Sequence, residues 1–157
     1  LITPLMILLI GSLRSGLVSM VPNLVPILLT LGLMGYAGIP LDMFTLLAGC
    51  IAIGLAVDDS IHFISGFRRY RYQGYDPVAA VERTMQTTGR ALLFTSIALT
   101  MGFAVLLMSE MLNLRQVGAL TAFAIATAFL LDVTVTPALL VLTHRKELVV
   151  STEGPTP

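Results

Sequence analysis

Four long apolar stretches dominate the sequence and leave few folds open to it. They cover residues 21–38, 44–67, 91–108 and 117–142, and each is long enough to cross a hydrocarbon core about 30 Å thick at about 1.5 Å per residue. A fifth stretch, residues 1–10, is expected to be part of one more helix. Because lipid offers the backbone no hydrogen bonds, each stretch must be helical. The sequence therefore predicts an all-α polytopic transmembrane bundle of about five helices, the first of them partial.

The composition agrees with a membrane protein and excludes several function classes. Of the 157 residues, 56% are hydrophobic and 11% are charged, and the mean hydropathy of +0.91 is far above that of a soluble domain. The nine basic and nine acidic side chains cancel, so the charge does not predict a nucleic-acid partner. The sequence has no metal-ligand cluster, nucleotide-binding glycine loop or nucleophile motif. We therefore expect no cofactor, no metal and no enzymatic activity.

The two ends predict a piece of a larger protein. The chain begins with Leu1 in an apolar run that lacks the basic start and the cleavage site of a signal peptide. The last seven residues, 151–157, are polar and rich in proline, as in an unstructured tail. We expect residues 143–157 to form a C-terminal tail.

The basic residues fall mostly on one side of the predicted membrane. Eight of the nine lie at Arg14, in the connection 68–90 and at positions 145–146, whereas Arg115 lies on the other side. Because Lys and Arg are enriched in cytoplasmic loops, the long connection and the C-terminus are predicted to be cytoplasmic.

The long connection contains a predicted amphipathic helix over residues 76–88. Asp76 can cap a helix that begins at Pro77, and apolar residues recur on one of its faces: Val78, Val81 and Met85. The arginine and tyrosine residues around it suit the headgroup level of a membrane. We interpret it as an interfacial anchor, with a specific lipid-headgroup site as the alternative.

Three carboxylates lie within the predicted spans. Asp58 and Asp59 are adjacent in the segment 44–67, and Asp132 lies in the last one. A carboxylate that faces lipid costs about 2.5–3.5 kcal/mol on insertion scales. We therefore expect all three to face the interior of the bundle or a water-filled cavity.

These carboxylates and two hydroxyl groups are predicted to share one depth in the membrane. Asp58 lies about 21 Å along its segment and Asp132 about 22 Å along the last one. Thr95 and Ser96 lie about 6–8 Å into the oppositely directed segment, which brings them to nearly the same level. A carboxyl group shielded from water has its neutral form favoured, and adjacent carboxylates repel each other when both are ionised. Such a layer is suited to loading and releasing protons.

Alternatives remain open for several of these residues. His62 lies one turn after Asp58 and is either a relay member or an interfacial helix-end residue. The aspartate pair could instead hydrogen-bond neighbouring helices together. Pro137 predicts a local break, so Asp132 could serve the relay or seat the end of the helix.

Small residues on the segment 44–67 predict close helix packing. Cys50 and Gly54 lie on the same helix face as Asp58, and small residues at this spacing let helix backbones approach each other. We expect this face to be buried against another helix rather than against lipid.

The motifs around the aspartate pair resemble a known superfamily. The run GLAVDDSIHF at 54–63 is followed by an arginine-rich loop with GYDPVAA at 74–80, then by TGRA at 88–91 and by DVTVTPALL at 132–140. This combination, in this order, resembles the resistance-nodulation-division superfamily of exporters. The most similar branch contains the hopanoid transporters and the mycobacterial membrane protein large family.

The resemblance implies a function and its site residues. It implies a proton-driven exporter of lipids or other hydrophobic compounds in the bacterial inner membrane, with two similar halves and large extracytoplasmic porter domains. The implied partners are membrane lipids, protons, the other half, the porter domains and a periplasmic lipid carrier. Asp58 and Asp59 match the proton-relay aspartates, and Thr95 or Ser96 matches a hydroxyl position on the adjoining helix. Multidrug members have a lysine in the second half where this chain has aspartate, which favours the lipid-exporter branch.

The sequence leaves other questions and functions open. It contains no part that would identify substrate-binding residues, and the polar tail favours the second half of a parent protein over a truncated first half. One alternative is a lipid-sensing bundle similar to sterol-sensing domains, which would tolerate Asp58→Asn. Another is an intramembrane aspartyl protease in which Asp58 and Asp132 share a proton, although residues 55–57 lack the glycine signature of such enzymes.

Overall fold

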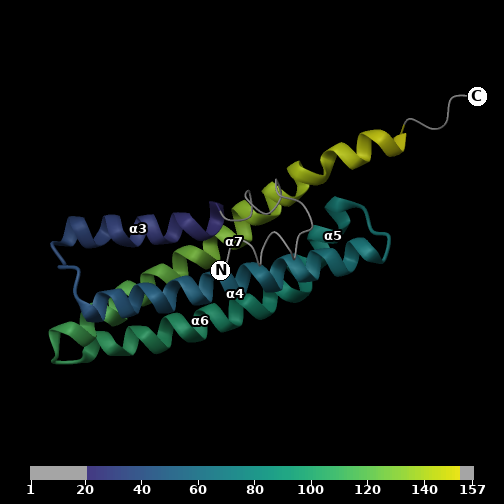
Figure 1. The fold of residues 1–157 in the computed structure, drawn as a ribbon. Helices are drawn as coiled ribbons and strands as arrows, with labels where there is room; N and C mark the ends of the chain where they lie inside the picture. The colour runs from purple at the N-terminus through teal and green to yellow at the C-terminus, as the bar shows by residue number, and fades with distance from the viewer. Residues whose placement is uncertain (1–20, 153–157) are drawn as a thin grey trace, which may run out of the picture.

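The computed structural model describes residues 21–152 and the surroundings of the side chains of residues 23–142. The predicted partial helix at 1–10 lies outside the described residues. The described helices are α3 (Val21–Ala37), α4 (Met43–Tyr72), α5 (Pro77–Thr84), α6 (Arg90–Val105) and α7 (Leu112–Thr152) (Figure 1). No strand occurs between residues 21 and 152, which confirms the predicted all-α class.

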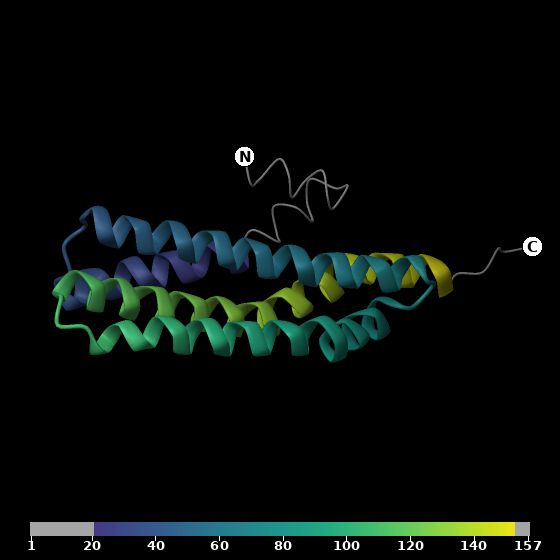
Figure 2. The ribbon, with the colours of Figure 1, turned by 90° about the horizontal axis from the view of Figure 1, so that it is seen from below.

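Three of these helical segments are long and apolar enough to cross a membrane: Met43–Tyr72, Pro77–Met108 and Leu112–Leu142. The helix α3 is apolar but has 17 residues, a length of about 26 Å. The connection between α3 and α4 and that between α6 and α7 lie at one end of the bundle, whereas α4 joins α5 at the other end (Figures 1 and 2). The helices therefore alternate in direction as the sequence predicts.

The amphipathic segment is joined to the span that follows it. A π-helical turn, Met85–Gly89, connects α5 to α6, so the helix that begins at Pro77 continues to Met108. No proline interrupts residues 78–108, and the wider π-helical turn lets the chain change direction without ending the helix.

The last helix extends beyond residue 142 and through its proline. Pro137 lies inside α7, which ends at Thr152, so the local break predicted at this position is absent. Leu140 lies one turn beyond Pro137 and is 5% exposed in the core. Packing on the far side of the proline therefore holds the helix together, because the loss of one backbone hydrogen bond is offset by contacts with neighbouring helices.

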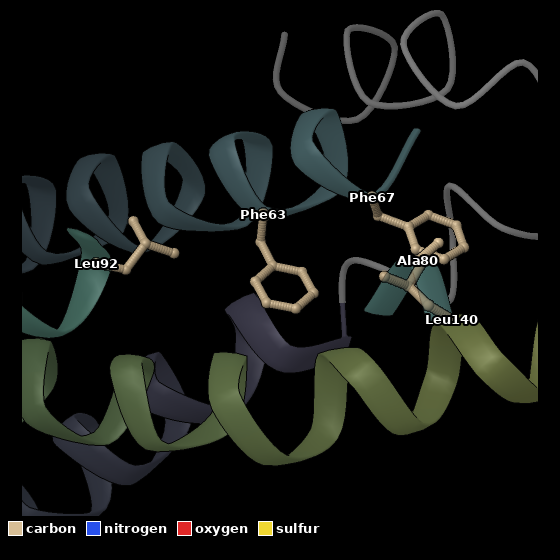
Figure 3. Packing of buried hydrophobic residues seen from close by; sticks show 5 residues of the cluster. All are labelled: Phe63, Phe67, Ala80, Leu92 and Leu140. Carbon is tan, nitrogen blue, oxygen red and sulfur yellow. The ribbon is translucent and has the colours of Figure 1, made fainter. Parts of the chain in front are cut away.

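The helix α7 is the centre of the bundle. It packs against α3, α4, α5 and α6. Near the arginine-rich end, a buried cluster contains one or two residues from each of four helices (Figure 3): Phe63 and Phe67 from α4, Ala80 from α5, Leu92 from α6 and Leu140 from α7. This cluster fixes the short α5 against the end of α4 and against α7.

Asp42 fixes the start of α4. Its Oδ1 accepts a hydrogen bond from the backbone N–H of Thr45 at 2.8 Å, while the Thr45 hydroxyl accepts one from the Asp42 N–H at 2.8 Å. This reciprocal pair satisfies two backbone donors at the helix end. The hydrogen bond from the Thr45 N–H lowers the pKa of the Asp42 carboxyl from its ordinary value.

The pH dependence of this cap follows from the sign of the shift. Because the folded pKa is below the unfolded pKa, the cap contributes its full stabilisation above the ordinary Asp pKa and loses it as the pH falls through the lowered value. We expect protection of the Thr45 amide from hydrogen exchange, corrected for the intrinsic rate, to decrease in that acidic range. Asp42→Asn should remove this dependence, since Asn caps without titrating; an unchanged profile would contradict the assignment.

Gly118 allows α7 to approach the end of α6. A Cβ atom at this position would lie 2.6 Å from Leu106 Cβ and 2.7 Å from the carbonyl oxygen of Phe103. The nearest obstacles are a backbone oxygen and a Cβ atom, which cannot move without shifting α6. Gly118 therefore sets the distance between α6 and α7 near their connection.

We expect Gly118→Ala to destabilise the bundle by about 1–3 kcal/mol through overpacking. The measurement is thermal unfolding of the full-length parent in detergent. Gly102→Ala is the matched control, because a Cβ atom there meets nothing within 4 Å and alanine favours the helix. Equal stability of the two variants would show that α6 can shift without cost.

Candidate functional site

Three consecutive polar residues of α4 point in three directions. Successive residues of an α-helix are rotated by about 100° around its axis. Accordingly, Asp58 is exposed, Asp59 is half-buried and Ser60 is buried. Each of the three side chains therefore meets a different part of the molecule, although they are neighbours in sequence.

Asp58 lies on an open face of α4 and pairs with His62. The His62 Nε2 atom lies 3.6 Å from Asp58 Oδ1, and both side chains are 64% exposed. The pair is an ion pair when His62 carries a proton, and the i, i+4 spacing places both residues on one face.

Asp59 lies between α4 and α6. The Ser96 hydroxyl of α6 donates a hydrogen bond to Asp59 Oδ2 at 3.4 Å. The hydroxyl of the neighbouring Thr95 instead donates to backbone oxygens of its own helix, at Ala91 and Leu92. Of the two hydroxyl candidates on this helix, Ser96 is therefore the one that reaches a carboxylate.

Asp132 is the most buried of the three carboxylates and lies where α3, α4 and α7 meet. Its side chain is 2% exposed, and Oδ1 accepts hydrogen bonds from Ser60 at 2.8 Å and from Thr136 at 3.0 Å. The Ser60 oxygen also lies 3.0 Å from Asn23 Oδ1 of α3. Asp132 Oδ2 is buried without a hydrogen-bond partner.

Sequence reasoning missed Ser60, Thr136 and Asn23. The spacing of four residues between Asp132 and Thr136 was a usable signal, because i and i+4 side chains meet on a helix. Ser60 directly follows the aspartate pair, but its orientation depends on how α4 is rotated in the bundle. Nothing in the sequence around Asn23 indicates that it lies beside Ser60, since the contact joins residues 37 positions apart.

The expected burial of the small-residue face of α4 does not occur within the described part of the chain. Cys50, Gly54, Asp58 and His62 are all exposed, and a Cβ atom added at Gly54 would meet nothing within 4 Å. The physical reason is that α3, α5 and α7 pack on the other sides of α4, and α6 reaches it through Ser96. An ionisable pair, Asp58 and His62, therefore lies on an exposed face within an apolar span.

The geometry does not support a shared proton between Asp58 and Asp132. A carboxyl dyad requires the two groups in direct contact, but Asp132 Oδ1 is bonded to Ser60 and Thr136 and its Oδ2 has no partner. Asp58 lies on the exposed side of α4. The two carboxyl groups therefore lie in different surroundings.

Within residues 23–142 no cluster of three or more His, Cys, Asp or Glu side chains could hold a metal ion.

Aromatic and arginine side chains interact around the α4–α5 connection. The Arg83 guanidinium lies 4.5 Å from the ring centre of Tyr75, and Arg71 donates to the Tyr75 carbonyl at 2.8 Å. Tyr70 and Tyr75 meet edge to face at 6.0 Å. These contacts fix the loop between α4 and α5 at the arginine-rich end of the bundle.

Comparison with known proteins gives relatives that are membrane proteins and exporters. A protein of Methanocaldococcus jannaschii named as a membrane protein, MJ1562, is 31% identical over 131 residues, which are 83% of this chain and 34% of the relative. The trehalose monomycolate exporter MmpL3 of Mycobacterium tuberculosis is 31% identical over 133 residues, 83% of this chain and 14% of that protein. The sulfolipid-1 exporter MmpL8 of the same species is 28% identical over 94 residues, 60% of this chain and 9% of that protein.

This chain therefore spans about a third or less of the length of these relatives. The sequence model of the MMPL family matches residues 1–155, which is nearly the whole chain and agrees with the resemblance carried by the aspartate pair and the motifs after it. The chain is a membrane protein and belongs to the MMPL family.

Proposed function

We propose that this chain is part of the membrane domain of an exporter of lipids or other hydrophobic compounds that is driven by the proton gradient. The carrying observation is the pair Asp58 and Asp59 inside the apolar helix α4. Ionisable groups within a membrane span are costly and mark proton or ion pathways. Membership of the MMPL family and the exporter activity named for MmpL3 and MmpL8 support the same function.

The two aspartates would act through charge neutralisation. Asp59, half-buried beside Ser96 of α6, loses its repulsion with Asp58 when either group binds a proton. The change in charge alters which arrangement of α4 and α6, joined by the Asp59–Ser96 hydrogen bond, is favoured. The proton can shift this equilibrium only because it binds one arrangement more tightly than the other. Protons would reach Asp59 through the exposed residues Asp58 and His62.

The exposed face of α4 that carries Asp58 and His62 indicates that other parts of the parent protein cover this helix. Charged groups that face lipid are unfavourable, so the Asp58–His62 face needs a polar or protein partner. We infer that the other half of the exporter covers it, and that extracytoplasmic porter domains and a periplasmic lipid carrier handle the substrate. The positive-inside rule supports an inner-membrane orientation with the arginine-rich connection and the C-terminus in the cytoplasm.

The central test replaces the aspartates in the full-length parent. Asp58→Asn and Asp59→Asn should each abolish export at equal membrane abundance, because Asn cannot exchange a proton. The measurement is mass spectrometry of lipids released to the outer surface of cells, with and without a protonophore. Asp42→Asn is the control, since this residue lies outside the span and Asn also caps a helix.

The possible outcomes separate the competing functions. Export that persists in both variants would show that the aspartates do not couple transport to protons and would make them structural. Absence of export by the unaltered parent would favour a lipid-sensing bundle. Loss of the protein from the membrane, rather than loss of export, would indicate that the pair joins helices together.

A second prediction distinguishes the two hydroxyl groups of α6. Ser96→Ala removes the hydrogen bond to Asp59 and should lower the export rate by roughly tenfold or less, since hydrogen bonds to charged groups contribute about 1.5–3 kcal/mol and this one is long. Thr95→Val removes a hydroxyl that bonds its own backbone and should have the smaller effect. A larger effect at Thr95, measured in the same export assay, would place the relay on the other side of α6.

A further inference from the structure

Ser60 stands between two acceptor oxygens but has one hydroxyl proton to give. Its Oγ lies 2.8 Å from Asp132 Oδ1 of α7 and 3.0 Å from Asn23 Oδ1 of α3. A hydroxyl group donates one hydrogen bond and accepts others. With these atoms in place, both contacts of Ser60 are hydrogen bonds only if Asp132 or Asn23 donates a proton to the Ser60 oxygen.

A protonated Asp132 supplies the missing donor. With the proton on Oδ1, Asp132 donates to Ser60, and Ser60 donates to the Asn23 amide oxygen. A proton on Oδ2 has no acceptor, because that atom is buried without a partner, and a buried donor without an acceptor is costly. The proton is therefore placed on Oδ1 by the surrounding atoms, and Oδ2 remains as a carbonyl oxygen.

An ionised Asp132 requires a different arrangement of the same atoms. Ser60 and Thr136 then both donate to Oδ1, and the Asn23 amide must present its NH₂ group to Ser60. Oδ2 would carry negative charge in a site that is 2% exposed, without a donor. The charged state is therefore poorly solvated, and its formation reverses the direction of the Ser60 hydrogen bond.

Within residues 23–142, few charged groups lie around this cluster. Asp59 of α4 acts on Asp132 electrostatically, and Asp58 and His62 lie on the exposed side of the same helix. The helix α3 has no Asp, Glu, Lys, Arg or His, and α6 has Arg90 at its first residue. On α5, Glu82 and Arg83 are exposed. The aspartate pair is thus the nearest source of a changing charge.

We propose that Asp132 is a second proton-binding carboxyl of the transport cycle, and that its proton turns the Ser60 hydroxyl from α7 toward α3. The inference rests on the proposed function, because it assumes that the charge on Asp58 and Asp59 changes during transport. Ser60 directly follows Asp59 on α4, so a rotation of this helix that moves Asp59 relative to α6 also moves Ser60 relative to Asp132 and Asn23. Asp132 and Ser60 act as positioning residues that link the aspartate pair to α3 and α7.

The test is infrared difference spectroscopy of the full-length parent in lipid nanodiscs, between acidic and alkaline buffer. We expect the carbonyl band of a protonated carboxyl that appears on acidification and is lost in Asp132→Asn. Ser60→Ala should shift both the frequency and the titration midpoint of this band, because the acceptor of the Asp132 proton is gone. Thr121→Val is the matched control: it removes a buried hydroxyl of α7 that has no hydrogen-bond partner, so the band should stay unchanged.

Two results would overturn the inference. A spectrum that is the same in Asp132→Asn would show that this group does not bind the proton, and a band of Asp132 present at every pH would make it a permanently neutral packing group. If Asp132→Asn does not fold, the test is whether the infrared carboxyl band shifts in Ser60→Ala but not in Thr121→Val. No shift in Ser60→Ala would contradict the inference. The pH profile of export should move in Ser60→Ala and not in Thr121→Val, which a purely structural role would not produce.

Failure of this inference is distinguishable from failure of the proposed function. Export retained in Asp58→Asn and Asp59→Asn removes the proton-coupled function whatever the infrared band does. Export lost in those variants, with no titrating band from Asp132, leaves the proposed function standing and removes only the second carboxyl.

Discussion

The structure depends on one constraint: polar groups inside an apolar span must find partners, and α4 carries three of them in a row. Helical geometry rotates successive residues by about 100°, so Asp58, Asp59 and Ser60 cannot share a single partner. Asp58 pairs with His62 on an open face, Asp59 meets Ser96 of α6, and Ser60 meets Asp132 of α7 and Asn23 of α3. The rotation of α4 in the bundle therefore decides all three contacts together.

The arrangement around α7 follows from this constraint. Because α7 packs against α3, α4, α5 and α6, a polar residue on the face of α7 that meets α3 and α4 is shielded from lipid. Asp132 occupies such a place at 2% exposure, while Leu140 holds the same helix in the apolar cluster near the arginine-rich end (Figure 3). The buried carboxylate and the apolar cluster together fix α7 against the end of α4.

Family membership and local geometry answer different parts of the functional question. The MMPL match extends over residues 1–155 and agrees with the motif at 54–63, whose adjacent aspartates first indicated the resemblance. The named relatives are much longer than this chain, and within the described residues a face of α4 with an ionisable pair is exposed. Both observations support a working unit larger than the described bundle, in which further helices cover α4.

The sequence by itself determined the class of the fold and the alternating direction of the helices. These properties follow from the length of apolar runs and the fixed rise of a helix, and local signals such as Asp76-Pro77 placed the start of α5. Only the tertiary structure decided which face of α4 is covered, that Ser96 rather than Thr95 reaches Asp59, and that Asn23 and Ser60 join Asp132. Those outcomes depend on the rotation of each helix about its axis, which is set by packing between residues far apart in sequence.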